Sequence, residues 1–156
     1  MGYEANGGFL IFGDLEQEGR NLPALPTRDA IVVAIAVLLL ARRQGVPVSE
    51  LMGLLPPRYT ASDRLKAFPT DLSQQRIAQL REGGAALMAE TFPGLGDVSA
   101  IDETDGLRMT FSNGEVVHLR PSGNAPELRC YNEADSAERA AELNAECLAL
   151  MAQWRD

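Results

Sequence analysis

Hydrophobic and polar residues alternate along the second half of the chain, which is the pattern of strands with one buried face. In the segment LRMTF, Leu107, Met109 and Phe111 alternate with an arginine and a threonine. Asp105-Gly106 precedes this segment and Asn113-Gly114 follows it, and both dipeptides favour tight β-hairpin turns. Together with VSAIDE before it and EVVHLR and ELRCYNE after it, the segment predicts four consecutive antiparallel strands.

A helix is predicted on each side of these strands. The first runs from Ser73 to about Glu82, with Asp71 or Ser73 as its cap, and continues over 85–92 after the interruption at Gly83-Gly84. The second follows Asp135, with Glu138 completing a capping box. Its apolar residues form one stripe at helical spacing, at Leu143, Cys147, Leu150 and Trp154.

An extended segment, RYTASDRLKAF, precedes the first of these helices. The element order is therefore β-α-β-β-β-β-α, which predicts an α+β fold. We expect an antiparallel, four-stranded-type sheet covered by two helices on one face. Pro56-Pro57 marks the expected boundary of this domain, which gives two parts, 1–57 and 58–156.

The first part is dominated by one apolar helix. It is predicted from about Arg28, with Thr27 as the cap, to Arg43, and a short strand over 9–12 precedes it. Residues 30–41 are apolar on every face, so this helix needs cover on all sides. We expect its partners to lie upstream of Met1, in an α/β domain of which this is a helical remnant. Self-association through the exposed apolar helix 30–41 is a further expectation.

Composition narrows the function classes. The net charge of −8 argues against a nucleic-acid partner, because phosphate backbones require clustered cations. The longest apolar run is about half of the roughly 20 residues that span a bilayer, so no membrane partner is expected. Cys130 and Cys147 have no metal-ligand spacing and form no disulfide framework, which favours a reducing, cytoplasmic location.

The turn RPSGN, between two predicted strands, is the strongest candidate for chemistry. Arg120 offers a planar fork of donors, Ser122 a hydroxyl and Asn124 an amide, while Gly123 permits a close approach with positive φ. Arg129, which begins the next strand, offers a second fork. Such a turn can bind a phosphate in a nest of N–H groups. The same residues are also ordinary turn formers, so an unremarkable connection remains the alternative.

Other polar residues are given plainer interpretations. The acids of DETDG flank a hairpin and are interpreted as solvated turn residues. His118 is expected on an exposed or edge strand, on the opposite face from Val117 and Leu119. Ser62, Asp63 and Arg64 form a polar cluster to which the sequence assigns no role.

RPSGNAPELRCYNEA resembles the phosphate-binding loop in the last domain of the α-D-phosphohexomutases, whose pattern is roughly R-P-S-G-T followed by proline and a strand with an arginine. Arg120, Ser122, Gly123, Pro126 and Arg129 match, and Asn124 stands where many members have threonine. The resemblance implies phosphate binding by Arg120, Ser122, Gly123, Asn124 and Arg129. It also implies that 58–156 is a fourth, TATA-box-binding-protein-like domain.

GYEANGG resembles the sugar-recognition loop of the family's third domain, often written G-E-M-S-G-H. Glu4 matches the glutamate, while Asn6 and Gly8 replace the serine and the histidine. These three positions are the implied sugar-binding residues. Residues 1–57 would then be the end of the third domain.

The resemblance implies phosphoserine-mediated transfer between mannose 6-phosphate and mannose 1-phosphate, on the route to GDP-mannose. The hexose phosphate and the upstream domains are the implied partners. The nucleophilic serine and the Mg²⁺ loop are expected upstream, so no catalytic residue, metal or cofactor is assigned here and the chain alone is expected to be inactive. The alternatives are a fragment of a phosphoglucomutase or phosphoglucosamine mutase, a free-standing phosphosugar-binding module, and a small interaction domain.

Overall fold

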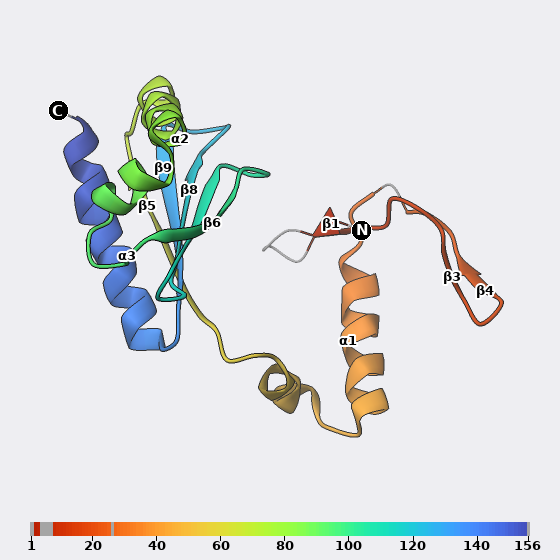
Figure 1. Cartoon of the computed structure of the whole chain (residues 1–156). Coiled ribbons are helices and arrows are strands. Elements are labelled where there is room, and N and C mark those ends of the chain that lie inside the picture. The colour runs from red at the N-terminus through yellow and green to blue at the C-terminus, as the bar shows by residue number, and fades with distance from the viewer. Residues whose placement is uncertain (1, 4–7, 26, 156) are drawn as a thin grey trace. The chain divides into compact units, whose positions relative to one another are not determined.

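The computed structural model describes residues 2–3, 8–25 and 27–155. The chain divides into two compact units, Met1–Pro56 and Pro57–Asp156, each of which is described by itself (Figure 1). The elements of the first unit are β1 Gly2–Tyr3, β2 Phe9–Leu10, β3 Leu15–Gln17, β4 Arg20–Leu22, α1 Ala30–Gln44 and the 3-10 helix η1 Val48–Leu54.

Helix α1 is capped by Asp29, whose carboxylate accepts hydrogen bonds from the backbone N–H groups of Ile31 and Val32 at 2.8 and 3.1 Å. The sequence had favoured Thr27, two residues earlier, and that assignment is wrong. The helix ends as expected at a glycine, Gly45, which has a positive φ of 69°. The hairpin of β3 and β4 was not predicted, because neither strand has an alternating apolar face.

The apolar residues of α1 are largely exposed within the described structure. Ile31, Ile35 and Leu38 are 70%, 50% and 61% exposed. Self-association through this helix stays a prediction. Within the described ranges no single helix has the length and apolar character needed to cross a membrane, and the bent pair Ile31–Gln44 and Val48–Leu54 meets that test only when both helices are taken together.

The second unit contains one five-stranded antiparallel sheet with strand order β5-β9-β8-β7-β6. Its strands are β5 Tyr59–Lys66, β6 Val98–Asp102, β7 Leu107–Phe111, β8 Val116–Pro121 and β9 Glu127–Ala134. The α+β class is confirmed. The sheet has five strands because the extended segment after Pro57 pairs with β9 along its whole length, from Tyr59 opposite Ala134 to Lys66 opposite Glu127.

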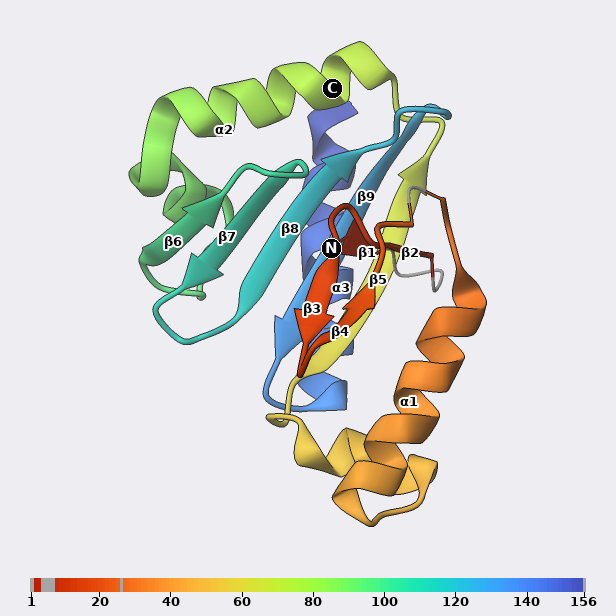
Figure 2. The same ribbon diagram turned by 90° about the vertical axis from the view of Figure 1, so that its right-hand side faces the viewer.

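Helices α2 Thr70–Thr91 and α3 Ala137–Ala152 cover one face of this sheet. Figure 1 shows both helices on the same side of the sheet, and Figure 2 shows α3 behind it. The hydrophobic core lies between the sheet and these helices. It is formed by residues from both helices and from alternating strand positions, including Leu80, Leu143 and Leu119. The other face of the sheet, termed the open face below, carries many of the polar strand residues, among them Arg64, Arg120 and Arg129.

The helix boundaries differ in detail from the predictions. Helix α2 begins at Thr70 without a side-chain cap and bends at Gly84, where φ is 64° and ψ is −163°. Helix α3 is capped by Ser136, which accepts a hydrogen bond from the N–H of Arg139 at 3.0 Å. The predicted capping box of Asp135 and Glu138 is therefore wrong, because the cap lies one residue later in the chain.

A buried polar network joins β9 to α3 inside the core. The side-chain amide of Asn144 donates to Asn132 Oδ1 at 2.8 Å and to the carbonyl of Cys130 at 3.2 Å. Asn132 in turn donates to the carbonyl of Val116 at 3.2 Å. The hydrogen bond with Cys147 raises the pKa of the Cys130 thiol, and burial raises it further. Both cysteines are free thiols that are buried in the core, so neither is an exposed nucleophile.

The ion pair between Glu115 and Arg139 predicts a pH-dependent stability. Arg139 donates two hydrogen bonds to the Glu115 carboxylate, at 2.6 and 3.0 Å, and this holds the pKa of Glu115 below its ordinary value of 4.5. A depressed folded-state pKa stabilises above the unfolded value and loses that effect as pH falls through the folded one. Glu115→Gln should lower the unfolding free energy by about 1 kcal/mol at neutral pH. The difference should shrink as pH falls below 4.5 and vanish only below the lower folded-state pKa.

Denaturant unfolding at a series of pH values measures this difference. Glu142→Gln is the control, because Glu142 lies 3.8 Å from the same guanidinium but is 68% exposed. The control should change the unfolding free energy little at any pH. An equal loss in both variants, or a Glu115→Gln loss that persists in acid, would contradict the assignment.

Candidate functional site

The register of the sheet places three arginines in one row on the open face. Arg120 of β8 lies opposite Arg129 of β9, and Arg129 lies opposite Arg64 of β5. Their neighbours along β8 and β9, such as Leu119 and Leu128, are fully buried in the core, so the arginines point to the other face. Like charges directly opposite each other destabilise a sheet. A row of three therefore suggests a requirement for positive charge at this place.

A second row lies beside the first. Arg108, His118, Tyr131 and Ser62 are successive cross-strand neighbours on β7, β8, β9 and β5. The rings of His118 and Tyr131 are 5.4 Å apart, and a ring nitrogen of His118 contacts the carbonyl of Asp105. His118 is half-buried on a central strand, so the expectation of an edge strand is wrong, while its separation from Val117 and Leu119 is confirmed.

Arg120 is held at the hairpin between β6 and β7. Its Nε donates to the Asp105 carboxylate at 2.9 Å. Hydrogen bonds to Tyr131 and to Asp105 raise the pKa of Arg120, so it is permanently charged. Interpreting Asp105 as a merely solvated turn residue is therefore incomplete, because its carboxylate orients a candidate phosphate ligand. Glu103 of the same turn pairs with Arg81 at 3.4 Å.

The turn after β8 is partly closed by its own hydrogen bonds. The N–H of Ser122 donates to the carbonyl of Glu127 at 2.9 Å, and the N–H of Asn124 approaches Ser122 Oγ at 3.4 Å. Ser122 is only 6% exposed. Gly123 is not among the described residues with positive φ, so that part of the expectation is wrong. A phosphate could bind to the N–H groups of Ser122 and Asn124 only if it displaced these two internal hydrogen bonds.

Arg129 and Arg64 share one carboxylate. Glu127 Oε1 lies 3.2 Å from Arg64 Nε, and Glu127 Oε2 lies 3.7 Å from Arg129 Nη2. The Nε of Arg129 is buried and has no hydrogen-bond partner. Both arginines also line a pocket of about 220 Å³ whose other walls are Ser62, Asp63 and Tyr131. The sequence had predicted that Arg120 and Arg129 lie close together and had named Arg64 without a role, but it had missed Glu127.

The implied sugar-binding positions are Glu4, Asn6 and Gly8. Glu4 and Asn6 lie outside the described residues. Gly8 precedes β2 in the first unit. No group of three or more histidine, cysteine, aspartate or glutamate side chains within the described ranges is arranged to hold a metal ion. The Mg²⁺ that the resemblance implies therefore has no fitting donor set among the described residues.

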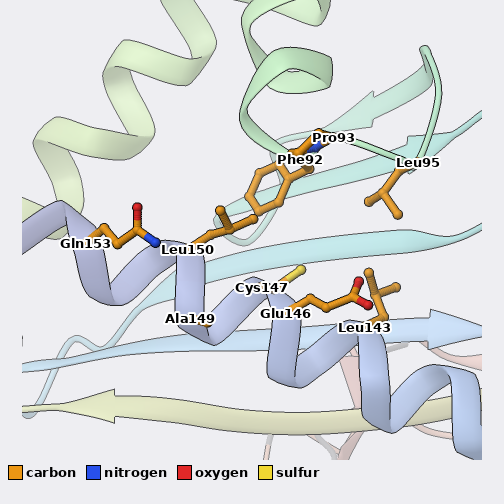
Figure 3. Close-up of a pocket in the computed structure, with 9 residues that line it drawn as sticks. All are labelled: Phe92, Pro93, Leu95, Leu143, Glu146, Cys147, Ala149, Leu150 and Gln153. Carbon is orange, nitrogen blue, oxygen red and sulfur yellow. The ribbon is translucent and has the colours of Figure 1, made fainter.

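An apolar pocket of about 320 Å³ lies on the helical side of the sheet (Figure 3). It is formed where the end of α2 meets α3, and Phe92, Cys147 and Leu150 are among its walls. Its polar groups are Glu146 and Gln153. It lies on the face opposite the arginine row and brings no cations together, so it is not the candidate anion site.

The fold and the open face define an α+β domain with a cationic row beside a Gly-containing turn. Residues 65–150 match the family described as phosphoglucomutase/phosphomannomutase, C-terminal domain. The chain belongs to this family, and the resemblance seen in the sequence is confirmed.

Three relatives support the same assignment. The chain is 41% identical over 151 residues to a phosphomannomutase of Sinorhizobium fredii, covering 97% of this chain and 32% of the relative. It is 44% identical over 146 residues to a phosphomannomutase of Salmonella muenchen, covering 91% and 29%. It is 30% identical over 142 residues to a phosphoglucomutase/phosphomannomutase of Thermococcus kodakarensis, covering 91% and 26%. The chain thus spans about a third or less of the length of these relatives.

Proposed function

We propose that the chain is the C-terminal part of a phosphomannomutase, which interconverts mannose 6-phosphate and mannose 1-phosphate. The two relatives that carry this name are 41% and 44% identical. Two relatives named probable phosphoglucosamine mutase are 29% and 30% identical over a smaller share of the chain. Residues 1–57 would then be the end of the third mutase domain, and 58–156 the fourth, phosphate-binding domain.

The proposed role of this fourth domain is to hold the phosphate that is not being transferred. The observation that carries the proposal is the register of β8 and β9, which sets Arg120 beside Arg129 next to the Ser122 turn. Two guanidinium forks from neighbouring rigid strands suit an oxyanion with several acceptors. The hydroxyl of Ser122, the backbone of Gly123 and the amide of Asn124 would complete the site from the turn.

Phosphoryl transfer depends on positioning and on stabilisation of charge, and a fixed phosphate clamp supplies positioning. The phosphoserine nucleophile and the Mg²⁺ that neutralises developing charge would come from other parts of the full-length enzyme. Glu4, Asn6 and Gly8 would contact the sugar hydroxyls. The chain alone is therefore proposed to be inactive and to serve a cytoplasmic enzyme of GDP-mannose synthesis.

Arg120→Ala should weaken phosphate binding by the chain about tenfold or more, because a charged hydrogen bond contributes about 1.5–3 kcal/mol. The measurement is an NMR titration of the whole chain with mannose 6-phosphate and with inorganic phosphate, following the backbone N–H signals of Arg120 and of 122–124. Selective, saturable shifts in the unaltered chain that are lost in the variant support the proposal.

Arg43→Ala is the matched control, because it removes the same charge from an exposed position on the first unit. It should leave the dissociation constant within about twofold, since screened surface charges contribute little. If Arg120→Ala bound phosphate as well as this control, the turn would be an ordinary connection and the proposed role would be wrong.

A further inference from the structure

Arg64 is the third arginine of the open-face row, and neither the phosphate turn nor the relatives' names assign it a role. It lies on the edge strand β5, directly opposite Arg129, and its side chain is 47% exposed. Neighbouring strands are about 4.8 Å apart, so Arg120 and Arg64 flank Arg129 with a backbone separation of about 10 Å. Two arginine side chains bridge that span easily. One oxyanion above Arg129 is therefore within reach of all three.

Glu127 already contacts two of these three arginines. Its two carboxylate oxygens are turned to two different arginines, at 3.2 Å from Arg64 and 3.7 Å from Arg129, and its side chain is only 18% exposed. One carboxylate faces two guanidinium groups, so Glu127, Arg64 and Arg129 together carry a net charge of +1. A phosphate monoester carries up to two negative charges and three terminal oxygens, which matches this arrangement better than a single carboxylate does.

The donors around Arg129 are not saturated. Its buried Nε has no hydrogen-bond partner, which is uncommon in native structures and points to a missing ligand or water. The adjacent pocket of about 220 Å³ is several times the roughly 30 Å³ of one water molecule. Ser62 and Tyr131 line it with hydroxyl groups that both donate and accept hydrogen bonds. Asp63 is the acidic residue of its lining, and its carboxylate accepts a hydrogen bond from the backbone N–H of Arg64 at 2.7 Å. The pocket has the size and the donors for a tetrahedral oxyanion.

We propose that Arg64 is a further phosphate-binding residue, and that Glu127 is an internal competitor which holds Arg64 and Arg129 until the phosphate displaces it. Arginines of β8, β9 and β5 then bind the anion together, so that binding does not depend on the turn alone. This inference rests on the proposed function, since it concerns the same phosphate. It assigns opposite effects to the two members of one ion pair.

The test is a titration of the whole chain with inorganic phosphate, monitored by NMR, for Arg64→Gln and Glu127→Gln. Arg64→Gln should raise the dissociation constant about tenfold, as expected for one charged hydrogen bond. Glu127→Gln should lower it about threefold or more, because a competing anion is removed while the side-chain shape is kept. Arg64→Lys keeps the charge but loses the planar fork, and should fall between Arg64→Gln and the unaltered chain.

Arg108→Gln and Glu133→Gln are matched controls. These residues form an ion pair at 3.1 Å on the same face and the same sheet, and their substitution changes the net charge identically. Both controls should stay within about twofold of the unaltered chain at physiological salt. Unfolding curves for all the variants establish that each one is folded.

The outcomes separate this inference from the proposed function. If Arg120→Ala loses phosphate while Arg64→Gln behaves like Arg108→Gln, the phosphate site stands and Arg64 is a structural partner of Glu127 only. If Glu127→Gln binds phosphate no better than Glu133→Gln, the competitor role is wrong. If no variant, Arg120→Ala included, alters binding, or if the unaltered chain shows no saturable shift, both proposals are overturned.

Discussion

The Phe111→Ala variant is expected to unfold with a free energy about 3–5 kcal/mol lower than that of the unaltered chain. Phe111 ends β7 and is 1% exposed. Its ring meets the ring of Phe92 edge-on, with centroids 6.3 Å apart and an interplanar angle of 72°. Deleting the ring leaves a cavity where the end of α2 packs on the sheet. Because domains are stable by only about 5–15 kcal/mol, this loss is a large share of the total free energy of unfolding.

Denaturant unfolding followed by circular dichroism measures the difference. Ile101→Ala is the matched control, because Ile101 lies on the neighbouring strand β6 but is 43% exposed. Its truncation should cost less than about 1 kcal/mol, since little apolar surface is returned to water. Similar losses in the two variants would mean that the core beneath the β7 end is not packed as described.

The second unit follows closely from local sequence signals. The alternation in LRMTF appears as alternating buried and half-buried positions along β7. Asp105-Gly106 and Asn113-Gly114 both lie in hairpin turns, with positive φ at each glycine. Period-two burial and turn chemistry are local properties, so one sequence suffices to predict them. The exact helix caps were missed because Thr27 competes with Asp29, and Asp135 with Ser136, and neighbouring capping residues are nearly equivalent.

Some residues of the candidate site could be predicted from the sequence and others could not, and the difference lies in how the strands pair. Arg120 and Arg129 flank one turn, so their proximity follows from the hairpin itself. Arg64 enters the row only because β5 pairs with β9, and the partner of an edge strand depends on the whole topology. Glu127 was within reach of the sequence, because it shares a period-two face with Arg129 and Tyr131 in ELRCYNE. Its pairing with Arg64 was not.

Gly106→Ala is expected to damage stability and phosphate binding together. Gly106 has a positive φ of 93°, and an added Cβ would lie 2.3 Å from the carbonyl oxygen of Leu119 and 3.2 Å from the Cα of Arg120. The obstructing atoms belong to the backbone of β8, so they cannot move aside cheaply. The backbone strain and the clash together should cost about 2–4 kcal/mol of unfolding free energy.

The same shift falls at the candidate phosphate site. Gly106 follows Asp105, the acid that orients Arg120, and its added methyl group would displace the backbone of Arg120 itself. Phosphate affinity should therefore fall several-fold, even though no group that contacts phosphate has been removed. A binding geometry set by rigid strands is sensitive to displacements well below the length of a side chain.

Gly114→Ala separates the two causes of this effect. Gly114 occupies the other hairpin turn with a similar φ of 84°, but an added Cβ there would meet nothing within 4 Å. It should lose only the cost of a left-handed conformation, about 1–2 kcal/mol, and bind phosphate normally. Equal losses of stability in both variants would mean that the left-handed backbone conformation is the sole cause and that the clash contributes nothing. Normal phosphate binding by Gly106→Ala would show that the β6–β7 turn does not position Arg120.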